Sequence, residues 1–236
     1  MSAAGMKLLY GAWGYEVSRE QLATNLPLFN MLNLRYILAP ATISLSQISD
    51  MKKIASLDLD VYESQGVWPR AFFTDRVFAY QGEEQLIQAL RTRAKTPFAA
   101  VAKEELKAEP LLNKFLSSVT SSTPRQTVAA TDYVLTNNRT SFNVKAPGPG
   151  VVVLTEAYMS HDFQLKVNGR PEHYFRVNSA FKGFFAPRAG EYTICFLYRP
   201  RYFTLLLCMS GVGIAVLIFW LAVLSRSSFA SSTSHV

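Results

Sequence analysis

The hydrophobic pattern of this chain changes twice, first to a two-residue period and then to an unbroken apolar run. The run covers Thr204–Leu224, 21 residues without a charged side chain. At about 1.5 Å of rise per helical residue it reaches roughly 30 Å, the thickness of a bilayer hydrocarbon core. We therefore predict one transmembrane helix at Tyr202–Ser225, a short polar tail at Arg226–Val236 and the lipid bilayer as a partner.

The two-residue period extends over residues 125–201. Short apolar runs alternate there with turn residues, and Asn168-Gly169 between two runs is typical of a hairpin. The predicted strands are Tyr133–Thr136, Ser141–Lys145, Val151–Tyr158, Phe163–Asn168, Tyr174–Val177, Phe181–Ala186 and Glu191–Tyr198. Short strands at this spacing predict a β-sandwich or jelly-roll-like domain.

Residues 1–124 have a mixed α+β pattern. Ser18 and Gln21 match a capping box at the start of a helix over Ser18–Leu34. Further elements are expected as strands at Leu34–Pro40 and Val67–Tyr80 and as helices at Glu83–Lys95 and Leu106–Leu116. Ser117–Pro124 is rich in serine and threonine, so we predict a domain boundary after residue 124. Met1–Trp13 lacks a continuous apolar stretch, and no signal peptide is expected there.

Positive charge is concentrated next to the apolar run. Residues 1–124 hold 13 Lys and Arg against 12 Asp and Glu, whereas residues 125–201 hold 10 against 5, an excess of five. Such a face would attract anionic head groups or an acidic glycan, and a merely solvated basic surface explains it equally well. Nucleic acid is not expected as a partner, because no recognition motif accompanies the basic residues.

Candidate chemistry is sparse. Only one cluster offers residue types that could hold a metal or form an acid/base pair, namely Glu156, His161, Asp162, Glu172 and His173 of the strand region. Their spacing is not that of metal ligands or of an acid/base pair, so we expect no metal, no cofactor and no catalytic residue. Cys195 and Cys208 are not expected to form a disulfide, because Cys208 lies inside the apolar run.

Two weaker patterns concern binding. Trp68 and Tyr158, with His161 in the following loop, are candidate glycan contacts, although aromatic residues on strands more often belong to the core. Gly211 and Ala215 are four residues apart in the apolar run. This spacing places small side chains on one helical face, where another membrane helix could approach closely.

Three stretches resemble the C-terminal part of YfhO-type bacterial membrane proteins, which are multi-spanning and similar to C-class, lipid-linked-sugar-dependent glycosyltransferases. They are Leu28–Pro40, Trp68–Leu90 and Val151–Phe203, the last ending in AGEYTICFLYRPRYF. The family's proline-glycine-tryptophan turn is replaced here by residues 160–163, SHDF. The resemblance covers nearly all of this chain but only the tail of a typical member, so no catalytic residue is transferred.

The resemblance implies a non-catalytic, extracytoplasmic accessory domain with a membrane anchor, acting with the multi-spanning half of a glycosyltransferase-like protein on cell-envelope glycans. A stand-alone membrane-anchored binding or scaffold protein is the alternative. Arg188, Arg199 and Arg201 precede the apolar run and only Arg226 follows it closely, so the positive-inside rule favours a cytoplasmic domain. The resemblance instead implies the extracytoplasmic side of the cell membrane, and we expect that side because long domains translocate largely regardless of charge.

Overall fold

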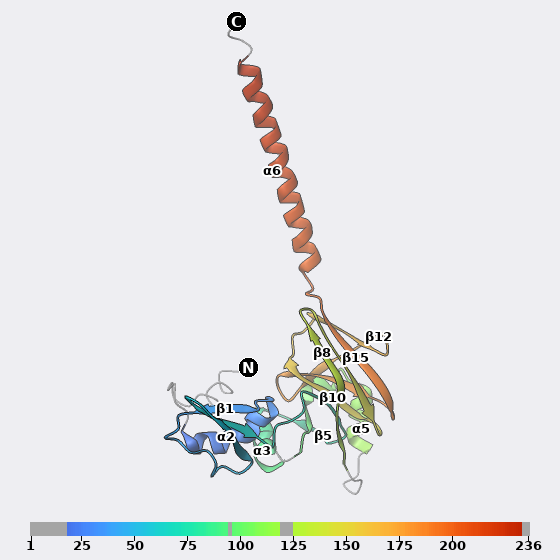
Figure 1. Cartoon of the computed structure of the whole chain (residues 1–236). Coiled ribbons are helices and arrows are strands. Elements are labelled where there is room, and N and C mark those ends of the chain that lie inside the picture. The colour runs from blue at the N-terminus through green and yellow to red at the C-terminus, as the bar shows by residue number, and fades with distance from the viewer. Residues whose placement is uncertain (1–17, 94–95, 119–124, 233–236) are drawn as a thin grey trace. The chain divides into compact units, whose positions relative to one another are not determined.

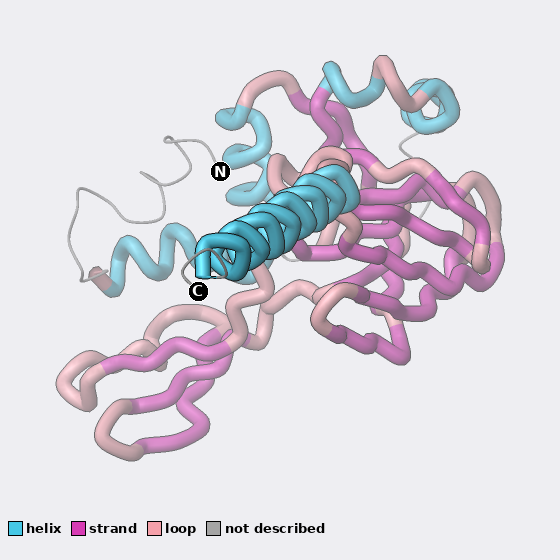
Figure 2. The backbone as a smooth tube through the Cα atoms, turned by 90° about the horizontal axis from the view of Figure 1, so that it is seen from above, coloured by secondary structure: helices cyan, strands magenta, loops and turns pink. Residues whose placement is uncertain are grey.

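The computed structural model describes residues 18–93, 96–118 and 125–232 (Figure 1). Outside the C-terminal helix, strand residues outnumber helical residues (Figure 2). Contacts between Cα atoms divide the chain into two compact units, residues 1–158 with 165–197, and residues 159–164 with 198–236. The first unit is a mixture of helices and mostly antiparallel sheets.

The first helix that the structure describes in this unit is α2 (Arg19–Met31). Ser18 and Gln21 form the expected capping box. The helix stops before the predicted end at Leu34, because Asn33 adopts a left-handed conformation with φ 62°. A three-stranded antiparallel sheet of order β1-β3-β2 covers α2, with strands β1 (Tyr36–Ala39), β2 (Met51–Ser56) and β3 (Asp60–Ser64).

A first five-stranded sheet, here called the β10 sheet, has the order β13-β14-β10-β4-β7. Its strands are β4 (Ala71–Thr74), β7 (Thr127–Ala129), β10 (Gly150–Ala157), β13 (Phe175–Val177) and β14 (Phe181–Ala186). Strand β4 pairs with both β10 and β7. The sheet therefore combines one strand from before the boundary predicted after residue 124 with four strands from after it.

A second five-stranded sheet, the β15 sheet, has the order β12-β11-β15-β9-β8. Its strands are β8 (Thr131–Thr136), β9 (Arg139–Ala146), β11 (Phe163–Val167), β12 (Arg170–Glu172) and β15 (Gly190–Tyr198). Asn168-Gly169 forms the expected hairpin between β11 and β12. Side chains alternate along β15, with Tyr192, Ile194 and Phe196 buried, as its two-residue period predicts.

The elements between β4 and β7 cover the main core. Strand β5 (Val77–Tyr80), helix α3 (Glu83–Arg93) and strand β6 (Ala99–Ala102) form a parallel two-stranded unit. Two helices follow, α4 (Lys103–Leu106) and α5 (Pro110–Ser118), in place of the one predicted over Leu106–Leu116. Pro110 explains the break, since proline is favoured in the first turn of a helix and not in its interior.

The second unit contains helix α6 (Phe203–Ser232). Its segment Phe203–Ala222 is long and apolar enough to cross a membrane, with a mean hydropathy of 2.5 and none of its residues buried. The helix continues beyond the predicted end at Ser225, because no proline or glycine follows Gly213 before its last residue. Within the same unit, the Phe163 and Tyr198 rings lie 5.2 Å apart.

Candidate functional site

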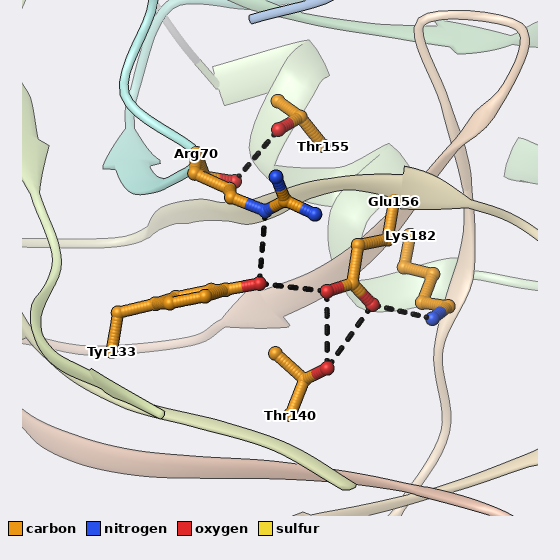
Figure 3. Close-up of polar contacts among 6 residues, drawn as sticks. All are labelled: Arg70, Tyr133, Thr140, Thr155, Glu156 and Lys182. Carbon is orange, nitrogen blue, oxygen red and sulfur yellow. Dashed lines mark hydrogen bonds and ion pairs between the residues drawn. The ribbon is translucent and has the colours of Figure 1, made fainter. Parts of the chain in front are cut away.

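The most strongly organised group of polar side chains surrounds the carboxylate of Glu156, near the end of β10 (Figure 3). Oε1 accepts hydrogen bonds from Tyr133 Oη at 2.8 Å and from Thr140 Oγ1 at 3.0 Å. Oε2 accepts from Lys182 Nζ at 3.1 Å. Tyr133 and Thr140 belong to the β15 sheet and Lys182 to the β10 sheet, so this carboxylate joins the two sheets.

Local backbone geometry positions Glu156. The pairing of β10 with β14 is regular from Gly150 to Leu154 and shifts register before Ala157. Such a bulge re-aims side chains that would otherwise follow the strict alternation of a strand. Glu156 lies inside the shifted segment, where its carboxylate reaches Lys182 of β14.

Lys182 is unusual for its burial. Its side chain is 1 % exposed, and Nζ lies 5.3 Å from the centre of the Phe196 ring. A buried ammonium group is costly unless a counter-charge and hydrogen bonds compensate it. The Glu156 carboxylate, itself 15 % exposed, supplies both.

Arg70 extends the network on the other side of Tyr133. Its Nε donates to Tyr133 Oη at 2.9 Å, and its guanidinium carbon lies 5.7 Å from the centre of the tyrosine ring. The backbone oxygen of Arg70 accepts a hydrogen bond from Thr155 Oγ1 at 2.9 Å. The chain just before β4 is thereby fixed to β10 and to β8 (Figure 3).

Burial and the contacts within the network have opposite effects on the pKa values of Glu156 and Lys182. Burial alone would raise the pKa of Glu156, but the hydrogen bond from Tyr133 and the charge of Lys182 outweigh it and leave the pKa below its ordinary value. Burial lowers the pKa of Lys182, and the carboxylate opposes that change only in part. Burial also raises the pKa of the Tyr133 hydroxyl, with a contribution from its bond to Glu156.

This arrangement is suited to holding two sheets together. Each charged group of the pair is engaged by hydrogen-bond donors or acceptors within the network. In the parts of the chain that the structure describes, no group of three or more His, Cys, Asp or Glu residues could hold a metal ion. We therefore interpret the network as a structural contact that holds the β10 sheet and the β15 sheet together.

The predicted glycan contacts lie in different surroundings. Trp68 is 1 % exposed and packs edge-on against Phe72 and Phe98, with ring centres 6.0 and 4.9 Å away. Its prediction as a glycan contact is wrong for this structure, because the surrounding core covers the ring. Tyr158 is half-buried against Tyr174, and His161 is an exposed loop residue with φ 68°.

The acidic residues and histidines of the strand region do not form one cluster. Glu156 binds the groups described above, whereas His173 Nδ1 lies within hydrogen-bond distance of Glu109 Oε1 in the α4–α5 connection. Sequence reasoning had not connected Glu156 to Lys182. A lysine within the apolar strand FKGFFA, where neighbouring side chains are buried, was the feature that could have indicated a buried partner.

The predicted helix-packing face remains open. Gly211 and Ala215 are both exposed on α6. A Cβ atom built on Gly211 would meet no atom within 4 Å among the described residues. This face of α6 is therefore uncovered along the part of the helix whose side chains are described.

Comparison with protein-family models, with curated proteins and with solved structures found no match.

Proposed function

We propose that the chain is a membrane-anchored, non-catalytic accessory protein whose β-rich unit works at the membrane surface. One observation carries this proposal: no residue of the apolar segment Phe203–Ala222 is buried. Such a surface is unfavourable in water by about 25 cal/mol for each Å² of apolar area. A bilayer removes that cost, and a helix satisfies its own backbone hydrogen bonds there.

The two five-stranded sheets are proposed to form a β-sandwich. Buried aromatic contacts join them, with the Phe184 and Tyr192 rings 6.0 Å apart and the Tyr174 and Phe196 rings 5.6 Å apart. Inward-facing apolar residues of two sheets normally provide the core of this architecture. The polar network around Glu156 adds a directional connection at the same interface.

The extracytoplasmic side and the link to glycosyltransferase-like membrane proteins rest on the resemblance to the YfhO-type C-terminal region. In that setting the unit would brace the multi-spanning half or help to position a cell-envelope glycan. A stand-alone anchored binding protein is the second candidate, and an open pocket of about 660 Å³ in the first unit favours it. Both candidates place the unit beside a membrane and differ in whether a multi-spanning partner is required.

Protease accessibility tests the side of the membrane. An epitope inserted within residues 119–124 would report digestion in intact cells, after permeabilisation of an outer membrane if one is present, and again in lysed cells. Digestion in intact cells supports the extracytoplasmic proposal. Protection until lysis contradicts it and leaves a cytoplasmic protein with a C-terminal anchor.

A partner is tested by crosslinking from α6. A photoreactive residue at Gly211 should crosslink to a multi-spanning protein if the accessory role is correct, while one at Val212 provides a control on a neighbouring face of the helix. Crosslinks to lipid alone at both positions would favour the stand-alone protein.

A further inference from the structure

An open pocket of about 660 Å³ lies in the first unit, and its lining residues are different from those of the Glu156 network. Helix α2, the turn at residues 47–50 and the end of α3 line it, and α2 and α3 are in contact (Figure 1). Its volume falls within the roughly 300–1,000 Å³ typical of small-molecule sites. We propose that this pocket binds a short, neutral oligosaccharide.

A buried amide group provides the first argument. Asn30 lines the pocket and is 6 % exposed. Its Oδ1 accepts a hydrogen bond from Ser64 Oγ at 2.6 Å, and its backbone oxygen accepts from Trp68 N at 3.0 Å. Within residues 18–93, 96–118 and 125–232, no acceptor is paired with its Nδ2. This amide can therefore donate to a ligand oxygen.

Gly66 keeps the space beside that amide open. A Cβ atom at this position would lie 2.8 Å from Asn30 Nδ2, closer than side chains tolerate without moving. Gly66 lines the same pocket. The absence of a side chain thus leaves the donor accessible from the pocket.

The charges of the lining favour a neutral ligand that both donates and accepts hydrogen bonds. Two guanidinium groups, Arg19 and Arg91, are balanced by two carboxylates, Glu20 and Asp50. Arg19 lies 3.6 Å from Glu20 and donates to Gln47 Oε1 at 2.7 Å. In the described part of the chain, Arg91 and Asp50 have no side-chain partner, so one donor group and one acceptor group remain for a ligand.

The pocket also has apolar lining residues, which suit the apolar faces of a sugar. Ala23, Leu26, Pro27 and Ile48 also line the pocket, and Leu26 and Ile48 are buried. Sugars combine hydroxyl groups, which donate and accept, with apolar C–H faces. A small anion would meet two carboxylates, and a purely apolar ligand would leave the Asn30 amide and the Arg91 guanidinium group unpaired.

This inference deepens the proposed function by naming a ligand for the same β-rich unit, and it rests on that unit being a binding domain. The test uses the full chain in lipid nanodiscs, because glycoside detergents would compete for the pocket. Saturation-transfer NMR with maltotriose, cellotriose and chitotriose should show contact with at least one of them. Citrate, a small anion of similar polarity, should show none.

Two variants tie binding to the pocket. Arg91→Gln removes a charged donor and Gly66→Ala blocks the Asn30 amide, so each should weaken the affinity for the bound trisaccharide at least about tenfold. Arg170→Gln, which changes an exposed arginine of β12 outside the pocket, is the matched control and should leave the affinity unchanged. Far-UV circular dichroism establishes that each variant is folded.

The inference is overturned if no trisaccharide binds, if citrate alone binds, or if both pocket variants bind as well as the original chain. None of these results bears on membrane anchoring, which is measured by fractionation. A result that overturns the ligand proposal is therefore distinguishable from a result that overturns the proposed membrane-anchored function.

Discussion

Lys182 Nζ lies 3.1 Å from Glu156 Oε2, and both residues are on neighbouring strands of the β10 sheet. The carboxylate is also hydrogen-bonded to Tyr133 and Thr140 of the β15 sheet. One buried ion pair thus supports contacts within a sheet and between sheets. Removing one of its two charges should therefore destabilise the protein more than breaking a surface salt bridge would.

The first prediction concerns the loss of one partner. Lys182→Met leaves the Glu156 carboxylate partly buried without its counter-charge, and should lower the free energy of unfolding by about 3–5 kcal/mol. Lys166→Met, at an exposed position of β11, should change it by less than about 0.5 kcal/mol. Chemical denaturation of the purified full chain, monitored by tryptophan fluorescence, measures both. An equal effect of the two substitutions would contradict the assigned role of Lys182.

The double variant provides a sharper comparison. Lys182→Met combined with Glu156→Leu replaces both charges by apolar groups, and should be less destabilising than Lys182→Met alone. The coupling between the two sites is obtained from a double-mutant cycle that includes Glu156→Leu. Additive effects would show that the ion pair contributes no interaction of its own.

The second prediction is a pH dependence. The pKa of Glu156 is lowered in the folded state from an ordinary value of 4.5. At pH values between the folded-state pKa and 4.5, the unfolded chain therefore binds more protons than the folded chain. The stabilisation is fully present above 4.5 and is lost as the pH falls through the folded-state pKa. Denaturation at a series of pH values should show this loss. The Glu156→Gln variant should lack the part of this stability loss that comes from residue 156. The Glu172→Gln variant, changed on β12, should lose stability with falling pH as the original chain does.

Several elements could be predicted from the sequence because their determinants are local. The capping box of Ser18 and the Asn168-Gly169 hairpin need only neighbouring residues. Strand β6, AAVA, was not predicted, because alanine is depleted in strands and this segment is fixed by its pairing with β5. The pairing of β4 with β10 joins residues far apart in the chain, and no local pattern reveals it.

The candidate site was harder to predict for the same reason. Glu156 was identified as one acidic residue among several, but its partners come from three other strands. The bulge that aims it at Lys182 is a feature of strand pairing. Trp68 was wrongly predicted as a glycan contact, since an aromatic residue before a strand gives no indication of which side will be covered.

The third prediction concerns Trp68. Trp68→Ala removes a side chain that is 1 % exposed and packed against Phe72 and Phe98, and should lower the free energy of unfolding by about 3–5 kcal/mol. Tyr158→Ala removes a half-buried ring and should cost less. Equilibrium denaturation monitored by far-UV circular dichroism tests the order. A larger loss in Tyr158→Ala would contradict the core position of Trp68.

The fourth prediction concerns the helix itself. Val212→Arg places a charge near the middle of Phe203–Ala222, where insertion into a bilayer costs about 2.5–3.5 kcal/mol for such a residue. The fraction of protein recovered in membranes should fall. Val212→Leu keeps the apolar character and should have no effect, so equal recovery of the two variants would argue against a membrane-spanning α6.

Fractionation of the full chain after an alkaline carbonate wash tests membrane anchoring most directly. The original protein should stay in the membrane pellet, and a variant lacking residues 202–236 should move to the supernatant as a folded β-rich protein. Recovery of the original protein in the supernatant, or of the shortened variant in the pellet, would contradict anchoring by α6.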